Sequence, residues 1–329
     1  MKLHITWLDG IRCIAIMLVI LTHATENAYV LNENLLNEST RYVAVLFHSL
    51  GRLGVPLFLF LTGFLLLDRR YEEIQISDFL RRKWLGLFIA TISWIIIYDL
   101  FLRAYMEQHT NIGQVLKEIF FLKNVNMPHM WYMPMIIGIY LFFPFTANAL
   151  QELKKYEILY FPLGVVSTYA FITPIFNEVY HVFSKGSFTY TLDIGFSGGV
   201  YGIYLIFGFL LHRQFLKNVA VRYLLVDVIL TFIGVIILQV FAFSYNKVLD
   251  PWYNWVAILL CSLGVFELLS RLPYQIWQHQ WVTVVSKYSF AMYLTHYPLL
   301  MILKPLLQKL FLPLPINAII LWGGDLSEA

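Results

Sequence analysis

The chain has 329 residues, of which 59% are hydrophobic and 13% are charged, and its formal net charge is +3. Soluble proteins carry about 25% charged residues, so this composition excludes an ordinary soluble protein and predicts an integral membrane protein. The small net charge without a basic tract argues against a nucleic-acid-binding protein. Cys13 and Cys261 lie in apolar runs far apart in the sequence, so we expect two buried free thiols and no metal site.

The apolar segments are long enough to be counted as transmembrane helices, because a helix needs about 20 residues to cross the ~30 Å hydrocarbon core. The sequence predicts spans near 6–25, 46–67, 84–104, 130–149, 156–176, 197–213, 222–243, 253–270 and 282–303, with a tenth beginning near 313. We therefore expect an all-α fold, a polytopic transmembrane bundle of about ten helices that forms one membrane-embedded domain over residues 1–329. The tenth segment meets Gly323 and Gly324 after a few apolar residues, which predicts a re-entrant or incomplete last helix.

Two further patterns concern the membrane surfaces. Basic residues cluster at 69–70 and 81–83, on either side of one short loop, which predicts a cytoplasmic N-terminus in a multi-pass protein of the cell membrane. Residues 112–123 are too few and too polar to span the membrane. Their apolar positions recur at helical spacing, so we expect this segment to lie along the outer interface.

The first predicted span carries charged and titratable groups, Asp9, Arg12 and His23. Eleven residues of α-helix place Arg12 and His23 about 20° apart on one face and about 16 Å apart along the axis. Asp9 precedes Arg12 by three residues and can pair with its guanidinium. One interpretation makes Arg12 and His23 anchors at the two membrane surfaces. The other makes them the ends of a polar track through the protein, because ionisable groups inside membranes usually face a cavity.

This segment, WLDGIRCIAIMLVILTH, resembles the opening of the acyltransferase-3 family of membrane-bound O-acyltransferases, in which an arginine or lysine is followed after ten residues by a histidine. The segments GRLGVPLFLFLTGFLL (51–66), HMWYMPMIIGIYLFFPF (129–145) and SKYSFAMYLTHYPLL (286–300) are similar to later segments of the same family. The resemblance extends over essentially the whole chain. Many members also carry an Arg-x-x-Arg motif before the third span, whereas this chain offers Arg81, Arg82 and Lys83.

The resemblance implies an enzyme that transfers an acetyl group from cytoplasmic acetyl-CoA to a hydroxyl of a cell-surface polysaccharide or lipid-linked glycan. A free hydroxyl is a poor nucleophile near neutral pH, and histidine is the usual base for activating one. His23 occupies the family position of that base or, alternatively, of a transient acyl carrier. Asp9 and Arg12 complete the expected catalytic set. Arg12, Arg81, Arg82 and Lys83 are the expected contacts of the donor phosphates.

Other polar residues in the apolar segments are candidates for substrate binding: Arg52, His129, Trp131, Ser289, Tyr293 and His296. Each has a structural alternative. Arg52 can extend along apolar surface to reach water. His129 and Trp131 can belong to an interfacial aromatic belt. The stripe that includes Ser289, Tyr293 and His296 can serve helix–helix hydrogen bonding.

Two further functional hypotheses stay open at this point. The chain can be a polysaccharide export component, although the inverted repeats typical of transporters are not visible in the sequence. It can also be a non-catalytic relative with the same fold, because fold alone does not determine chemistry. Membrane lipids are expected partners under every hypothesis.

Overall fold

The computed structural model describes residues 6–30, 38–107, 111–184, 199–243, 245, 247 and 249–309, and these residues contain helices and no strand. The α-helices, in chain order, are α1 (Thr6–Val30), α2 (Glu38–Gly51), α3 (Gly54–Leu66), α4 (Glu73–Asp78), α5 (Leu85–Met106), α6 (Ile112–Ile119), α7 (Tyr132–Gln151), α8 (Tyr160–Ser167), α9 (Thr173–Ser184), α10 (Gly199–His212), α11 (Val221–Phe243), α12 (Val256–Ser270) and α13 (Gln280–Lys309). Short 3-10 turns η2 (Pro128–Trp131), η3 (Tyr156–Leu159) and η6 (Tyr274–Trp277) and π-helical segments η1 (Phe79–Trp84) and η4 (Thr168–Ile172) connect or extend them. The all-α prediction is confirmed.

The described residues contain six helical segments long and apolar enough to cross a membrane: Thr6–Glu26, Tyr42–Leu66, Glu73–Met106, Pro128–Gln151, Tyr156–His181 and Val221–Phe243. The apolar helices α10 and α12 are shorter. Helix α13 contains the ninth predicted span. The second predicted span is two helices, α2 and α3, which meet at Arg52. The third begins earlier than predicted because α4 and η1 continue into α5. The tenth predicted span lies outside the described residues.

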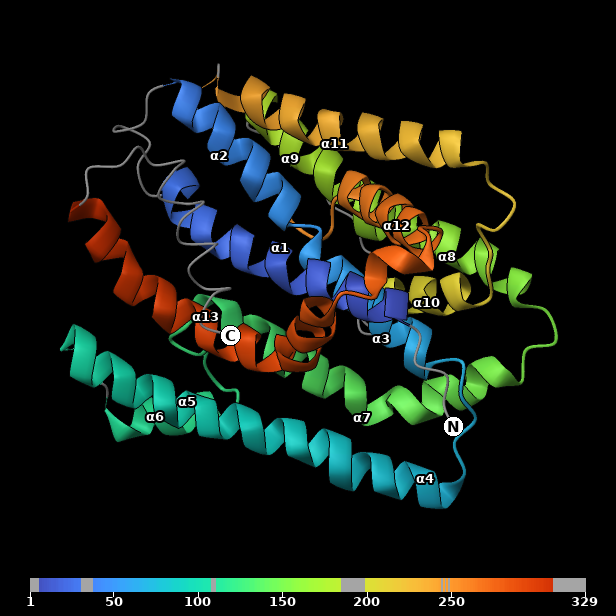
Figure 1. Cartoon of the computed structure of the whole chain (residues 1–329), viewed down its shortest axis with the longest axis horizontal. Coiled ribbons are helices and arrows are strands. Elements are labelled where there is room, and N and C mark those ends of the chain that lie inside the picture. The colour runs from blue at the N-terminus through green and yellow to red at the C-terminus, as the bar shows by residue number, and fades with distance from the viewer. Residues whose placement is uncertain are drawn as a thin grey trace.

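Helix α1 forms the centre of the bundle, where it packs against α2, α3, α12 and α13. Figure 1 shows α1 lying between α2 on one side and α13 on the other. Cys13 and Cys261 are buried free thiols, as predicted. The outer helices α5 and α11 instead expose large apolar side chains such as Leu100 and Leu230. An apolar exterior around a packed interior suits a lipid environment. The helical backbone suits it as well, because a helix satisfies its own backbone hydrogen bonds in hydrocarbon.

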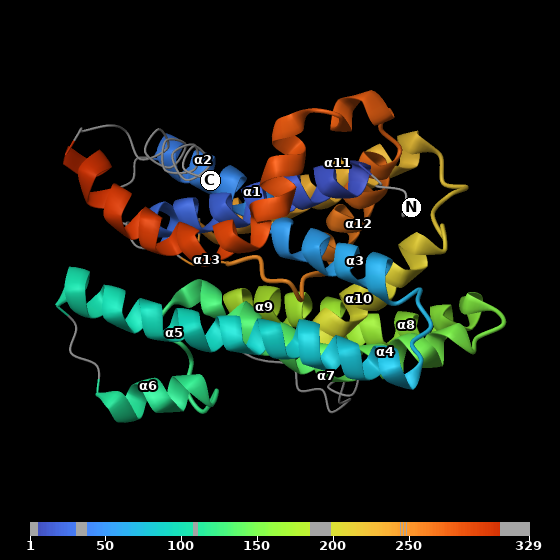
Figure 2. The same cartoon turned by 60° about the horizontal axis from the view of Figure 1, so that its bottom comes forward.

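Helix α6 stands apart from the main bundle and runs beside α5 (Figure 2). Asn111 begins it by accepting a hydrogen bond from the Gly113 backbone N–H at 3.0 Å, an N-cap that satisfies one free amide of the first turn. Ile112 and Phe120 are exposed, whereas Glu118 is buried. The short helix predicted from residues 112–123 is therefore present, and its position along the membrane surface stays a prediction.

Helices α3 and α10 approach closely because a glycine lies on each side of their contact. A Cβ atom on Gly63 would overlap the backbone carbonyl of Leu205, and a Cβ atom on Gly208 would overlap that of Phe60. Small residues allow helix backbones to pack in this way inside membranes. The contact holds α3 against the core and thereby fixes the residues of α3 that line the cavity described below.

We expect Gly63→Ala to lower the free energy of unfolding by about 1–3 kcal/mol, the range for overpacking a tight contact. Gly138 in α7 is the matched control, because nothing lies within 4 Å of a Cβ added there. Gly138→Ala should leave the stability unchanged or slightly raised. Thermal unfolding in detergent micelles compares the two variants, and equal melting temperatures would contradict close packing at Gly63.

Candidate functional site

The polar end of the site is a three-residue network between α1 and α13. Arg12 Nη1 donates to Asp9 Oδ1 at 3.1 Å and to Ser286 Oγ at 3.0 Å. Ser286 Oγ donates to the same Asp9 oxygen at 2.7 Å. The spacing of three residues along α1 brings Asp9 and Arg12 to one face, as predicted, and the packing of α13 on α1 adds the serine. The network holds the guanidinium in the lining of a cavity.

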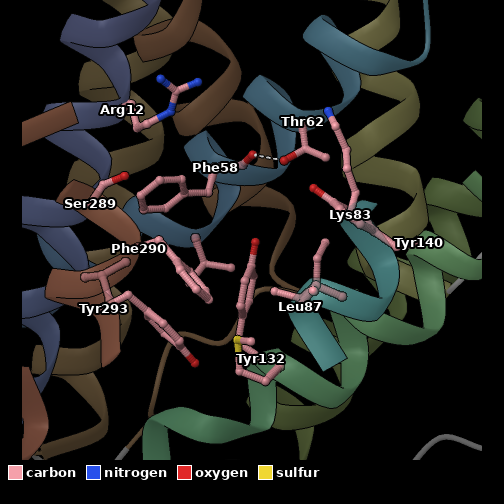
Figure 3. A pocket seen from close by; sticks show the side chains of 15 residues that line it. Arg12, Phe58, Thr62, Lys83, Leu87, Tyr132, Tyr140, Ser289, Phe290 and Tyr293 are labelled. Carbon is pink, nitrogen blue, oxygen red and sulfur yellow. Dashed lines mark hydrogen bonds between the residues drawn. The ribbon is translucent and has the colours of Figure 1, made fainter. Parts of the chain in front are cut away.

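This cavity has a volume of about 410 Å³ and is bordered by α1, α3, η1, α5, α7 and α13. Its lining comprises Arg12, Val19, Val55, Phe58, Thr62, Lys83, Gly86, Leu87, Tyr132, Met133, Ile136, Tyr140, Ser289, Phe290 and Tyr293. Figure 3 shows Arg12 and Lys83 on opposite walls at one end, with Tyr132 and Tyr293 at the other. Between them the wall is mainly apolar. The cavity is thus cationic at one end and aromatic at the other.

The predicted basic triplet separates into two groups. Arg81, Arg82 and Lys83 lie in the π-helical segment η1, a distortion that is frequent at functional sites. All three side chains are exposed, but only Lys83 lines the cavity. Arg82 lies 4.0 Å from Asp78 across an exposed ion pair. Only Lys83 of the triplet therefore shares the cavity with Arg12.

His23 lies at the other end of the same face of α1, and a carboxylate holds it. Its Nδ1 lies 3.0 Å from Glu26 Oε2. A carboxylate accepts hydrogen bonds, so Nδ1 carries the ring hydrogen in the neutral imidazole, and Nε2 is the basic nitrogen. Sequence reasoning missed Glu26, although residues three apart on a helix lie on one face and its position after His23 could have indicated the pair.

Two further histidines gather around His23. The ring centroid of His296, from α13, lies 5.2 Å from that of His23, and the ring centroid of His129, from η2, lies 6.2 Å away. The His129 and His296 centroids are 4.9 Å apart, and both side chains are fully buried. Tyr297 stacks on His129 with a centroid distance of 5.2 Å. We call His23, His129 and His296 the histidine cluster.

Hydrogen bonds fix the orientation of both buried histidines. His296 Nδ1 donates to the Tyr293 carbonyl at 2.7 Å and lies 3.2 Å from the Met292 carbonyl. His129 Nε2 lies 3.1 Å from Tyr98 Oη, and Tyr98 Oη donates to the Leu294 carbonyl at 2.6 Å. Sequence reasoning gave no role to Tyr98, because its partners are 31 and 196 residues away.

One face of α13 connects the two ends of the site. Ser286 contacts Arg12, Ser289 and Tyr293 line the cavity, and His296 belongs to the histidine cluster. Tyr293 also donates from its hydroxyl to the His129 carbonyl at 2.7 Å, which ties the cavity wall to the cluster. The predicted polar stripe therefore follows the route from the cationic end to the histidines.

Arg52 lies at the break between α2 and α3 and is 3% exposed. Its Nη2 donates to Asp250 Oδ1 at 2.7 Å and to Oδ2 at 2.5 Å, and its guanidinium carbon lies 4.7 Å from the Trp252 ring centroid. His48 Nε2 lies 3.0 Å from Asp250 Oδ1. Burial raises the pKa of the Asp250 carboxyl, but the His48 hydrogen bond and the Arg52 charge outweigh it and lower that pKa to about 2.

Trp131 joins an aromatic group beside Arg52 rather than the histidine cluster. Its ring centroid is 5.5 Å from that of Trp252, 5.5 Å from that of Tyr253 and 5.4 Å from that of Tyr201. Glu26 lies within electrostatic range of Arg52 and His48, so the aromatic and Arg52 region borders the His23–Glu26 pair. The candidate substrate residues thus form two adjoining groups, one around the histidines and one around Arg52.

Within the described residues, no three His, Cys, Asp or Glu side chains are arranged to hold a metal ion. The described arrangement brings together a histidine with a carboxylate partner and two cations that line a mainly apolar cavity. This combination suits transfer of a group from an anionic, extended donor to a nucleophile beside His23.

Comparison with known proteins identifies the family of the chain. The chain matches the acyltransferase 3 family, described as an acyltransferase domain, over residues 5–324. Neither the search of curated proteins nor the search of solved structures returned a significant match. The matched range contains every residue of the cavity and of the histidine cluster. The chain belongs to the acyltransferase 3 family of multi-pass membrane acyltransferases.

Proposed function

We propose that this protein transfers an acetyl group from cytoplasmic acetyl-CoA to a hydroxyl of a cell-surface polysaccharide or of a lipid-linked glycan. The observation that carries the proposal is a cavity with Arg12 and Lys83 at one end and, at the other, Tyr293, whose hydroxyl donates to the His129 carbonyl. Membership of an acyltransferase family supplies the reaction class. The donor, the acceptor and the orientation are the proposed parts.

The donor fits the cavity by charge and by length. Coenzyme A is an anion whose phosphates suit a guanidinium and an ammonium group. Arg12 is further oriented by Asp9 and Ser286. The pantetheine arm would then follow the mainly apolar wall toward the histidine cluster, over the helical rise of about 16 Å between Arg12 and His23.

In the proposed mechanism His23 lies beside the acceptor hydroxyl. His23 Nε2 removes the proton from the acceptor hydroxyl as the oxygen attacks the thioester carbonyl carbon. The new C–O bond forms, the C–S bond breaks, and the thiolate leaves with the proton that His23 held. Glu26, bonded to Nδ1, stabilises the imidazolium that exists between the two proton transfers. General base catalysis of this kind contributes about 10²–10⁴-fold to rate.

The acceptor would lie at the Arg52 side of His23. Trp131 and Trp252 offer flat apolar faces that suit the carbon–hydrogen face of a sugar ring, and Arg52 and Asp250 lie beside them. We propose that this end faces outward and that the Arg12 end faces the cytoplasm, consistent with the basic clusters near the Arg12 end. The reaction would then join a cytoplasmic donor to an acceptor at the outer half of the membrane.

The direct test uses purified protein in nanodiscs with radiolabelled acetyl-CoA and a de-O-acetylated cell-surface polysaccharide fraction. We expect release of free coenzyme A and appearance of an alkali-labile acetyl ester on the polysaccharide. Movement of the glycan across the membrane without any acetyl transfer would instead favour the export hypothesis. Absence of both donor binding and transfer would favour a non-catalytic relative.

The separation of the basic triplet gives a sharper prediction about the donor. Lys83 lines the cavity and Arg81 does not, so we expect Lys83→Ala to weaken acetyl-CoA binding about tenfold, as for loss of one hydrogen bond to a charged group. Arg81→Ala, which removes the same charge from the same helical segment, should change the affinity less than about twofold, because Arg81 lies outside the cavity and acts on the donor only through water. Calorimetric titration with acetyl-CoA measures both. Equal losses would mean that general surface charge, and not the cavity, holds the donor.

A further inference from the structure

The hydroxyl groups of the cavity wall differ in what their hydrogens bind. Among the residues that the structure describes, those with a hydroxyl in the lining are Thr62, Tyr132, Tyr140, Ser289 and Tyr293. A hydroxyl in a protein interior normally gives its hydrogen to an acceptor, because a polar group without a partner is destabilising there. The partner of each hydrogen therefore shows which hydroxyl is available to a bound molecule.

Most of these hydroxyl groups use their hydrogen within the protein. Thr62, Ser289 and Tyr293 donate to backbone carbonyls at 2.9, 2.9 and 2.7 Å. Tyr140 is hydrogen-bonded to Thr62, whose own hydrogen goes to a carbonyl, so Tyr140 is the donor of that pair. The oxygens of these groups can still accept a hydrogen bond, but they have no hydrogen left to donate.

Tyr132 differs from the other four. Its hydroxyl has no hydrogen-bond partner in the described part of the chain. Its ring packs against Trp131 and Tyr293, with centroid distances of 6.0 Å and 5.8 Å. Figure 3 shows the hydroxyl pointing into the cavity, from the aromatic end toward the cationic end. The cavity therefore presents a free hydroxyl hydrogen at a fixed place in a mainly apolar wall.

The middle of the proposed donor has groups that need such a hydrogen. Between its phosphates and its sulfur, coenzyme A carries a pantetheine arm that contains amide groups. The committed hydroxyl oxygens of the lining suit the amide N–H groups, but an amide carbonyl needs a donor. A carbonyl that leaves water without finding a donor weakens binding. Arg12 and Lys83 are assigned to the phosphates, which leaves the Tyr132 hydroxyl for the arm.

We propose that Tyr132 is a specificity residue for the donor, and that its hydroxyl donates a hydrogen bond to an amide carbonyl of the pantetheine arm. The cavity thereby distinguishes a pantetheine thioester from acyl donors without this arm, such as acyl phosphates. The arm is not part of the reacting bonds, so the contact is equal before and during transfer and contributes to donor binding. This inference rests on the proposed function, in which the donor lies in this cavity.

The test compares Tyr132→Phe with Tyr288→Phe, which removes the same hydroxyl group from an exposed tyrosine outside the cavity lining. Each purified protein in nanodiscs is titrated calorimetrically with two ligands. One is acetyl-CoA, and the other is 3′-phospho-ADP, the nucleotide half of coenzyme A, which lacks the pantetheine arm. Thermal unfolding of each variant reports on folding.

For Tyr132→Phe we expect the affinity for acetyl-CoA to fall about fivefold, as for one hydrogen bond between neutral groups. The affinity for 3′-phospho-ADP should change less than about twofold, because its phosphates bind at Arg12 and Lys83. In the transfer assay the KM for acetyl-CoA should rise about fivefold with kcat little changed, the pattern for loss of uniform binding. Tyr288→Phe should match wild type with both ligands.

The nucleotide half separates this inference from the proposed function. If wild type binds both ligands and Tyr132→Phe binds acetyl-CoA as tightly, Tyr132 does not contact the arm, and the inference is overturned while the donor site stands. If Tyr132→Phe weakens both ligands equally, its role is structural and the inference is again overturned. If wild-type protein fails to bind acetyl-CoA or 3′-phospho-ADP, the proposed donor site fails and the inference fails with it.

Discussion

Replacing His23 by alanine is expected to lower acetyl transfer about 10²–10⁴-fold, the contribution of a positioned general base. The loss should fall on kcat, with little change in the affinity for acetyl-CoA, because the cationic end with Arg12 and Lys83 is untouched. A radiochemical transfer assay gives kcat, and calorimetric titration gives the affinity. The physical reason is local: without Nε2, no group bonded to Glu26 remains to take the hydroxyl proton.

His279 provides the matched control, since it is exposed and lies outside the cavity and the cluster. His279→Ala should transfer acetyl groups at the wild-type rate. Both variants should insert into membranes and unfold at similar temperatures. If His23→Ala is folded and retains wild-type kcat, His23 is not the base, and the acceptor must be activated elsewhere.

The second large effect concerns stability. Asp250→Ala would leave Arg52 buried without its carboxylate, and we expect the free energy of unfolding to fall by about 3 kcal/mol, the lower end for breaking a buried ion pair. The lower end applies because the Asp250 side chain is 40% exposed, although that of Arg52 is 4% exposed. Asp78→Ala is the control, because its pair with Arg82 spans 4.0 Å between exposed side chains. The control should cost less than about 1 kcal/mol.

Chemical unfolding in micelles measures both variants. The pKa of Asp250, lowered to about 2 against an ordinary value of 3.8, means that the stabilisation is fully present above pH 4. It is lost as the pH falls through 2. The difference between wild type and Asp250→Ala should therefore stay constant from pH 8 to pH 4. Equal stabilities of Asp250→Ala and Asp78→Ala would show that the Arg52 pair does not hold the α2–α3 break.

Much of the fold could be predicted because each membrane span is recognisable from the hydropathy and length of its own segment. Each of the first nine predicted spans coincides with helix in the structure, since a hydrocarbon environment forces long apolar segments to satisfy their own backbone. The break at Arg52 was not predicted. Apolar residues continue on both sides of it, and the carboxylate that holds the arginine there, Asp250, is 198 residues away.

In the candidate site, too, contacts within one helix could be predicted and contacts between helices could not. Pairs on one helix, such as Asp9 with Arg12, follow from helical spacing, as does the stripe of Ser289, Tyr293 and His296 on α13. The basic triplet at 81–83 was assigned to the donor as a unit, yet a π-helical segment turns only Lys83 into the cavity. Regular α-helical geometry does not reveal such a distortion. Contacts between helices, such as Tyr98 with His129, have no local pattern at all.

The central claim is that the donor binds with its phosphates at Arg12 and Lys83 in the cavity and with its thioester past Tyr293, beside the histidine cluster, whose three imidazoles are not part of the cavity lining. An experimental structure of the protein with bound coenzyme A tests this most directly. The account predicts phosphate oxygens within hydrogen-bond distance of Arg12 and Lys83, and the sulfur beside the His23 imidazole. Coenzyme A bound instead in the separate cavity of about 370 Å³ lined by Trp7, His212 and Lys217 would contradict it.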